Sequence, residues 1–329
     1  MSALEQLPTR ITVEAPARLH FGVLDLRGHL GRRFGGIGAA VPVPAVRLEV
    51  TRNESITAEG PDAGRAQEFA RRFLASNQLK GGAHLCVAQS IPPHVGLGSG
   101  TQLALAVGRA LAELHGIQME PPALARAVGR GVRSAIGTWV FALGGFVLEG
   151  GRRPGSDGVA PLISRLPMPS AWQVVIVIPE GKPGLSGETE AEAFAQLPRP
   201  SEREVERVAH LVLMELLPAL AEADLADFGA ALSEIQRVTG AWFAGAQGGA
   251  FAAGASAELV RLLAEFGAQG VGQSSWGPTV YGLTPDADSA RDLASRVRAR
   301  LGDSGVVYQT GFAQRGALVH TEWTAVGRD

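Results

Sequence analysis

The chain of 329 residues contains one cysteine and no long apolar run. Cys86 has no partner for a disulfide within the chain, so we expect a reducing, cytoplasmic setting. No segment reaches the ~18 apolar residues that span a bilayer, because residues 136–148 are too few and Arg109 interrupts the other candidate. The residues around Glu5 and Arg10 lack the apolar core of a signal peptide. The histidines show no metal-binding spacing, which predicts no zinc site.

Neither sign of charge is in excess, since 30 basic residues oppose 32 acidic ones for a net charge of -2. With aromatic residues at only 6%, this balance argues against a nucleic-acid binder with a broad basic face. The 46% hydrophobic content is typical of a globular protein, and the length favours two domains. A turn-rich segment at 150–169 places the predicted division between residues 1–165 and 166–329. We expect a protein that acts on small molecules.

Lysine is nearly absent, because only Lys80 and Lys182 stand among the 30 basic residues and the other 28 are arginines. Guanidinium groups are planar forks suited to phosphate and carboxylate. A biased genome composition would produce the same excess.

Residues 92–101, Pro-Pro-His-Val-Gly-Leu-Gly-Ser-Gly-Thr, precede apolar residues at helical spacing. This pattern predicts a loop that enters a helix N-terminus, where unpaired N–H groups and the helix dipole favour a phosphate or pyrophosphate. A tight turn in which Ser99 caps the helix is the alternative. The spacing matches neither a P-loop nor a dinucleotide motif, and Leu97 stands where a nucleophile elbow needs glycine. The predicted phosphate-binding residues are Gly96, Leu97, Gly98, Ser99, Gly100 and Thr101.

Basic side chains outside this loop are further candidates. Arg18 and His20 would share one face of a strand that begins near residue 11, although a structural bridge from Arg18 to Asp25 is the alternative. Arg32 and Arg33 lie in the glycine-rich segment 27–38, which suits either a flap over an anionic substrate or a solvated turn.

Two further cations lie next to predicted apolar segments. Arg133 precedes the apolar stretch 138–148 and could bind a phosphate or carboxylate. Lys182 lies in the loop 179–188, at the end of a strand predicted to be fully buried at 172–178.

The remaining pattern predicts a mixed α+β fold. The second half reads as a split α+β sandwich, because a strand–helix–strand pattern ends the chain. A second glycine-serine loop is expected at 270–283. Helices are expected at 64–76, 121–130, 188–196, 202–217, 223–243, 257–266 and 287–300, and a strand at 306–310.

Three motifs in this order resemble the GHMP kinase superfamily: Pro16-Ala17-Arg18-Leu19-His20, residues 92–101 and residues 272–277. Within it the sequence is most similar to the β-ribofuranosylaminobenzene 5'-phosphate synthase family, in residues 18–22, 32–36 and 274–279. The resemblance implies a two-domain fold, with an N-terminal domain like domain 2 of ribosomal protein S5 and a ferredoxin-like C-terminal domain. It also suggests a homodimer.

The resemblance implies that phosphoribosyl pyrophosphate and 4-aminobenzoate, or 4-hydroxybenzoate, give a C-riboside 5'-phosphate with loss of pyrophosphate and CO2. This reaction belongs to methanopterin biosynthesis. The phosphate-binding loop would hold the pyrophosphate with Mg2+, for which Thr101 and Asp25 are candidate ligands. His20 is a candidate for proton transfer, or a structural histidine.

The aromatic acid would bind near the third motif, at Ser274, Ser275 and Trp276. The ring of Trp276 is a candidate platform, or a core residue. Arg18, Arg33 or Arg133 is the candidate clamp for the carboxylate.

An ATP-dependent small-molecule kinase is the main alternative. Kinases of the superfamily usually place an aspartate base ahead of the glycine pair matched here by Gly144-Gly145, whereas this chain has Ile136 there. A kinase would need an acid from elsewhere, such as Asp25 or Glu188. A catalytically inactive ligand-binding protein is the third possibility.

Overall fold

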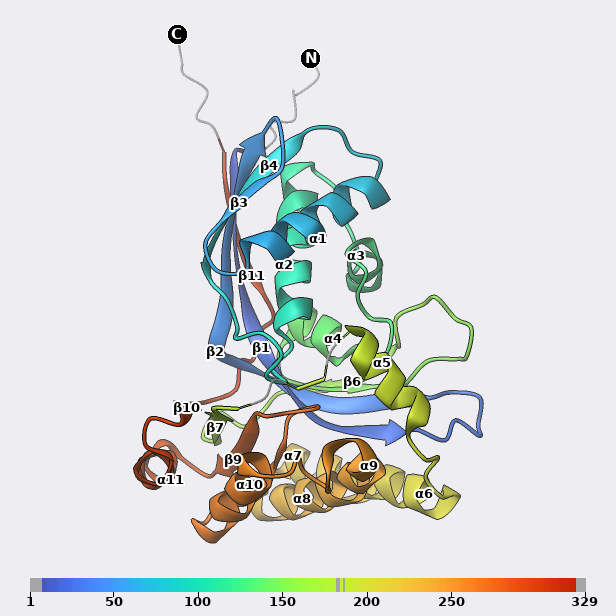
Figure 1. The fold of residues 1–329 in the computed structure, drawn as a ribbon, viewed down its shortest axis with the longest axis vertical. Coiled ribbons are helices and arrows are strands. Elements are labelled where there is room, and N and C mark those ends of the chain that lie inside the picture. Colours follow the sequence, from blue (N-terminus) through green and yellow to red (C-terminus); the bar gives the residue numbers. More distant parts are fainter. Residues whose placement is uncertain (1–7, 182–183, 186, 324–329) are drawn as a thin grey trace.

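The structure, a computed structural model, describes residues 8–181, 184–185 and 187–323. Its first half is built on a seven-stranded sheet with helices packed against one face (Figure 1). The strand order is β11-β1-β2-β4-β3, and β5 pairs with β2 and with β6. The strands are β1 (Arg10–Asp25), β2 (Phe34–Asn53), β3 (Thr57–Glu59), β4 (Gly82–Gln89), β5 (Phe146–Glu149), β6 (Leu162–Leu166) and β11 (Leu318–Glu322).

Strands β1 and β2 form a long antiparallel hairpin at the centre of this sheet. Residues 34–38, expected within a glycine-rich loop, are instead the first part of β2. This part of β2 pairs with β1 on one side and β5 on the other. A Cβ on Gly38 would lie only 2.4 Å from the carbonyl oxygen of Leu19 and 2.7 Å from Cγ2 of Ile136. Glycine is therefore needed here for close packing in a sheet.

Four helices cover the sheet, with α2 buried at their centre (Figure 1). The predicted helix at 64–76 is confirmed, and the apolar residues predicted after the loop are buried in α2. Helix α3 is shorter than predicted, because Gly129 and Gly131 follow with φ of 69° and 79°. The helices are α1 (Ala63–Ser76), α2 (Ser99–Leu114), α3 (Pro121–Ala127) and α4 (Ile136–Leu143).

The second half has an antiparallel four-stranded sheet in the order β10-β7-β9-β8. The predicted buried strand is confirmed in β7, and the expected loop at 270–283 is a turn flanked by two strands. The strands are β7 (Gln173–Pro179), β8 (Gly270–Gln273), β9 (Val280–Thr284) and β10 (Gly305–Thr310). The helices are α5 (Gly187–Gln196), α6 (Glu202–Leu211), α7 (Leu217–Glu222), α8 (Leu225–Trp242), α9 (Ala244–Gln247), α10 (Ala255–Glu265) and α11 (Ala287–Leu301), and a π-helical turn (Val212–Leu216) joins α6 to α7.

The two halves meet where α8 packs against both β1 and β8. Gly22 of β1 allows this approach, since a Cβ there would lie 3.1 Å from Cγ2 of Ile235. The last strand, β11, returns to pair with β1 in the first sheet. The mixed α+β prediction is confirmed, and the division at residues 165 and 166 stays a prediction. Within the described ranges, none of the helices is long and apolar enough to cross a membrane.

Candidate active site

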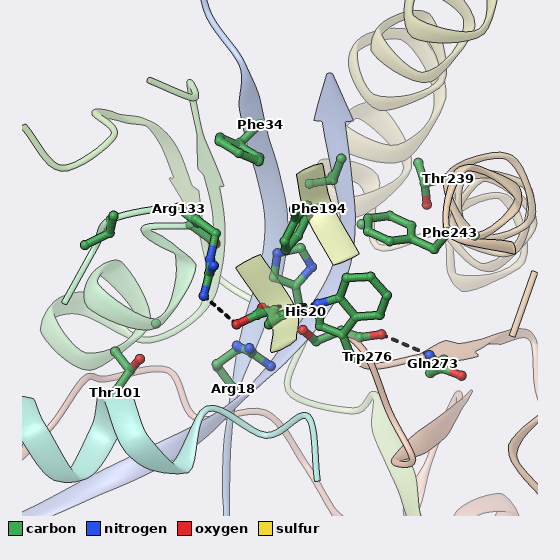
Figure 2. A pocket seen from close by; sticks show the side chains of 18 of the residues that line it. Arg18, His20, Phe34, Thr101, Arg133, Phe194, Thr239, Phe243, Gln273 and Trp276 are labelled. Carbon is green, nitrogen blue, oxygen red and sulfur yellow. Dashed lines mark hydrogen bonds and ion pairs between the residues drawn. The ribbon is translucent and has the colours of Figure 1, made fainter. Parts of the chain in front are cut away.

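A cavity of about 330 Å³ lies between the two halves of the molecule. Its walls come from β1, the first turn of α2, residues 129–134, α5, α8 and the turn after β8. Figure 2 shows Arg133, Thr101 and Arg18 toward one end, and Phe243, Thr239 and Gln273 toward the other. The cavity thus joins an end rich in arginine to an end lined by aromatic rings and amides.

The three motifs noted in the sequence meet at the guanidinium group of Arg18. Nη1 of Arg18 donates to the carbonyl oxygen of Gly96 and, at 3.4 Å, to Oγ of Ser274. Ser274 Oγ donates to the same carbonyl at 2.7 Å and accepts from the backbone N–H of His20 at 3.0 Å. Burial lowers the pKa of Arg18 to about 10, so the group stays charged at neutral pH. A cation is therefore fixed beside the glycine-rich loop.

Helix α2 begins at Ser99, after Gly98 with a left-handed φ of 79°. Among the residues that the structure describes, no side chain caps this helix, so Ser99 does not have the capping role of the alternative interpretation. A Cβ on Gly98 would lie 2.9 Å from Cγ of Arg18, and one on Gly100 would lie 3.1 Å from Nη2 of Arg130. The glycines thus allow two guanidinium groups to approach the positive end of the helix, which is a strong site for an anion.

Two further arginines, Arg130 and Arg133, line the cavity with Arg18. Arg130 lies over the ring of Phe69 at 4.8 Å, and its pKa is lowered by burial and by the nearby Arg72 and Arg65. Arg133 forms an ion pair of 2.6 Å with Glu190. Among the described residues, Glu190 contributes the only carboxylate to the lining. Three guanidinium groups against one carboxylate leave the cavity positively charged and suited to an anionic ligand.

Glu190 is a residue that the sequence analysis missed. It lies on α5, which was predicted from residue 188, and Phe194 follows it one turn later on the same face. The one sequence signal that pointed to Glu190 was its spacing from Phe194, which places a carboxylate and an aromatic ring on the same face of the predicted helix.

His20 lines the cavity but is otherwise buried, with 9% of its surface exposed. Burial, followed by the charge of Arg18, lowers its pKa to about 3. Its imidazole is therefore neutral near pH 7 in the free protein, and a role in proton transfer stays a prediction.

The buried neutral state of His20 predicts a pH-dependent stability. Between about pH 6.5 and pH 3 the unfolded chain binds a proton at His20 and the folded chain does not, so stability is lost as the pH falls. Over this window we expect the free energy of unfolding of His20→Asn to fall less steeply with decreasing pH than that of wild type. The two slopes should differ by about 1.4 kcal/mol per pH unit. Urea unfolding at a series of pH values measures the difference. His210→Asn, at an exposed position on α6, is the control, and parallel curves for His20→Asn and wild type would contradict the assignment.

Aromatic rings form the opposite end of the cavity. The ring of Trp276 lies edge-on to Phe194 at 5.3 Å and to Phe243 at 4.9 Å, and Phe34 meets Phe194 at 5.8 Å. Trp276 is 8% exposed and lines the cavity, so it belongs both to the core and to the site. Its Nε1 donates to Oε1 of Glu190 at 3.1 Å. These rings provide walls that a flat aromatic ligand can contact.

Glutamine amides complete this end and were also missed in the sequence. Gln236 donates to the carbonyl oxygen of Phe21 and accepts from the backbone N–H of Gln273 at 2.9 Å. The amide of Gln273 donates to Gln247 at 3.1 Å and to the carbonyl oxygen of Ser275 at 3.0 Å. These glutamines have no local sequence signature, because their bonds to Phe21, to Gln247 and to each other join distant segments.

Several predicted site residues have other positions. Arg32 donates to the carbonyl oxygen of Gly151 at 3.1 Å and Arg33 to that of Leu26 at 2.9 Å, and neither lines the cavity. Lys182 lies outside the described residues. Thr101 and Ser275 do line the cavity, whereas Leu97 and Ser274 are buried beside it.

The predicted magnesium ligands, Thr101 and Asp25, are not brought together at the cavity. Asp25 is outside its lining, and Oδ1 of Asp25 accepts from the backbone N–H groups of Arg27 and Gly28 at 2.6 and 2.8 Å. In the part of the chain that the structure describes, no three His, Cys, Asp or Glu side chains gather in a metal-binding group. Thr101 and Asp25 therefore do not form one binding site in this structure, and magnesium stays a prediction.

Ile136, at the position where superfamily kinases usually carry their aspartate, is the first residue of α4 and is fully buried. The nearby carboxylate of Glu149, also missed in the sequence, is fully buried and does not line the cavity. It accepts from the backbone N–H groups of Ala135 at 3.3 Å and Gly151 at 2.7 Å, and burial raises its pKa to about 7. Glu149 therefore holds the segment that carries Arg130 and Arg133.

Known protein families match the chain in both of its halves. The GHMP kinases N terminal domain matches residues 64–145, and the GHMP kinases C terminal domain matches residues 216–303. The beta-ribofuranosylphenol 5'-phosphate synthase of Archaeoglobus fulgidus is 37% identical over 83% of this chain and 88% of its own length. That of Methanothermobacter thermautotrophicus is 33% identical over 94% of this chain and 98% of its own.

Solved structures agree with the fold. A homoserine kinase from Cytophaga hutchinsonii superposes with a TM-score of 0.69 at 18% identity, covering 97% of this chain and 99% of its own. Together with the two domain matches, this likeness confirms the predicted two-domain GHMP kinase fold. The chain belongs to the GHMP kinase superfamily and, within it, to the family of the beta-ribofuranosylphenol 5'-phosphate synthases.

Proposed function

We propose that this enzyme transfers the ribose 5-phosphate unit of phosphoribosyl pyrophosphate to 4-hydroxybenzoate or 4-aminobenzoate, with release of pyrophosphate and CO2, in methanopterin biosynthesis. The observation that carries the proposal is a single cavity with an arginine-lined helix N-terminus at one end and aromatic walls at the other. One end suits a phosphorylated donor and the other an aromatic acceptor. The names of the relatives support a product that joins ribose phosphate to a phenol.

The donor would lie with its pyrophosphate at the first turn of α2. Arg18 and Arg130 lie against this turn and would stabilise the charge that grows on the pyrophosphate as the C1–O bond breaks. The electron pair leaves with the pyrophosphate, and the ribose becomes an oxocarbenium ion. Water must be kept from this ion, which the surrounding rings and buried β1 would do.

The acceptor would lie against Trp276 with its carboxylate-bearing ring carbon facing the ribose C1. Attack by that carbon forms the new C–C bond, and the bond to the carboxylate then breaks so that its electron pair restores the aromatic ring and CO2 departs. This sequence consumes and releases no net proton. It is therefore compatible with a neutral His20 and with a buried Ile136 in place of the kinase aspartate.

The test is a turnover assay with phosphoribosyl pyrophosphate, Mg2+ and either aromatic acid labelled in its carboxyl group. We expect labelled CO2 and pyrophosphate in equal amounts. The kinase alternative predicts no CO2 but consumption of ATP with an alcohol acceptor. Binding of the labelled acid with neither reaction would favour a ligand-binding protein. Either the kinase result or this binding-only result would refute the proposal.

A further inference from the structure

Helix α5 inserts a carboxylate and an aromatic ring into the cavity from successive turns. Oε2 of Glu190 lies 2.6 Å from Nη2 of Arg133, and its Oε1 accepts from Nε1 of Trp276 at 3.1 Å. The ring of Phe194 lies edge-on to Trp276 at 5.3 Å, and Cζ of Arg133 is 5.6 Å from the centre of that ring. Arg133 thus contacts a carboxylate and an aromatic ring at once, which are the two groups of a benzoate.

Helix α5 is held at the surface of the molecule. None of its side chains that the structure describes is fully buried, and only Glu190, Ala193 and Phe194 are partly covered. The side chains of Glu190 and Arg133 are 21% and 33% exposed, so the ion pair is open to exchange with solvent ions. Its separation would cost less than that of a fully buried pair.

We propose that Arg133 is the clamp for the carboxylate of the aromatic acid, and that Glu190 and Phe194 occupy the place of this acid in the free protein. The identity of the acid rests on the proposed function. A second carboxylate beside Arg133 would be repelled by Glu190, so the incoming acid displaces Glu190 from Arg133 and from the N–H of Trp276. Glu190 is therefore a specificity-determining residue, since a ligand must bind Arg133 and the aromatic walls more strongly than Glu190 and Phe194 do.

Benzoate is the probe, because it has the ring and the carboxylate but lacks the para substituent. Its affinity is measured by isothermal titration calorimetry without donor. We expect Glu190→Gln to bind benzoate about ten-fold more tightly than wild type, because the competing charge is gone while the side-chain shape is kept. Arg133→Gln should bind it about ten-fold more weakly, and Glu190→Gln should bring no gain when added to Arg133→Gln.

Glu192→Gln is the matched control, because it removes the same charge from an exposed position of α5. It should leave the affinity unchanged. If Glu190→Gln binds benzoate more weakly than wild type, or equally well, the inference is overturned. This holds even if the enzyme releases CO2 in the turnover assay. Tighter binding by Glu190→Gln together with no CO2 release would uphold the clamp and refute the proposed function instead.

Discussion

Arg18→Gln should lower kcat/KM for phosphoribosyl pyrophosphate about a thousand-fold. Arg18 lines the cavity and is bonded to both the glycine-rich loop and the third motif, through Gly96 and Ser274. Glutamine removes the positive charge at the first turn of α2, where the leaving pyrophosphate gains charge. The loss should be larger in kcat than in KM, because this charge is greatest in the transition state. Steady-state kinetics of CO2 release measures both constants.

The matched control for Arg18 is Arg32→Gln, which also neutralises an arginine but outside the cavity. We expect Arg32→Gln to retain kcat/KM within about three-fold of wild type. Far-UV circular dichroism and thermal unfolding should show that Arg18→Gln stays folded, because Ser274 still donates to Gly96 in the variant. Equal losses in the two variants would mean that overall charge, and not the position of Arg18, supports catalysis.

Trp276→Ala should lower kcat/KM for the aromatic acid about a hundred-fold. The indole ring forms one wall of the aromatic end and contacts both Phe194 and Phe243. Its removal also leaves a void in a buried position, and should lower the free energy of unfolding by about 3–5 kcal/mol. KM for the donor should change little, because the variant keeps Arg18 and Arg130, the two arginines at the first turn of α2. Kinetics with each substrate varied in turn separates the two effects.

Two further variants complete this test: Trp276→Phe separates the ring from its N–H group, and Trp172→Phe is the control for the loss of a buried indole elsewhere. Trp276→Phe keeps an aromatic wall and should lose only a few-fold in kcat/KM for the acid. Trp172→Phe changes a buried tryptophan that packs on Phe228, away from the cavity, so it should lose stability without a change in KM. If Trp276→Ala kept the kinetic constants for the acid while losing stability, Trp276 would be a core residue and not part of the acceptor site.

The charge distribution in the cavity bears on the choice between a synthase and a kinase. A kinase of this fold would need a free carboxylate beside the acceptor hydroxyl. Glu190, the only carboxylate in the described lining, has both oxygens engaged by Arg133 and Trp276. Glu149 is buried outside the cavity and accepts from two backbone N–H groups. In the free protein both acids are thus engaged by other groups, and neither is a free carboxylate.

Local patterns in the sequence were sufficient for the elements and for part of the site. The start of α2 was predicted correctly because proline and glycine followed by helically spaced apolar residues depend only on neighbouring positions. Arg18 and His20 share a face because side chains alternate along a strand. The segment 34–38 was misjudged as a loop, because its glycines are required by packing against Leu19 and Ile136.

By itself, the sequence determined the superfamily, the α+β class and the loop at the start of α2, since these depend on residue type and on spacing along the chain. Only the tertiary structure decided which charged groups share the cavity: it brought Glu190 to Arg133, placed Arg32, Arg33 and Asp25 elsewhere, and made His20 neutral. The physical reason is that Coulomb energies and burial depend on distances in space, and segments more than 250 residues apart, such as those of Arg18 and Ser274, become neighbours only through folding.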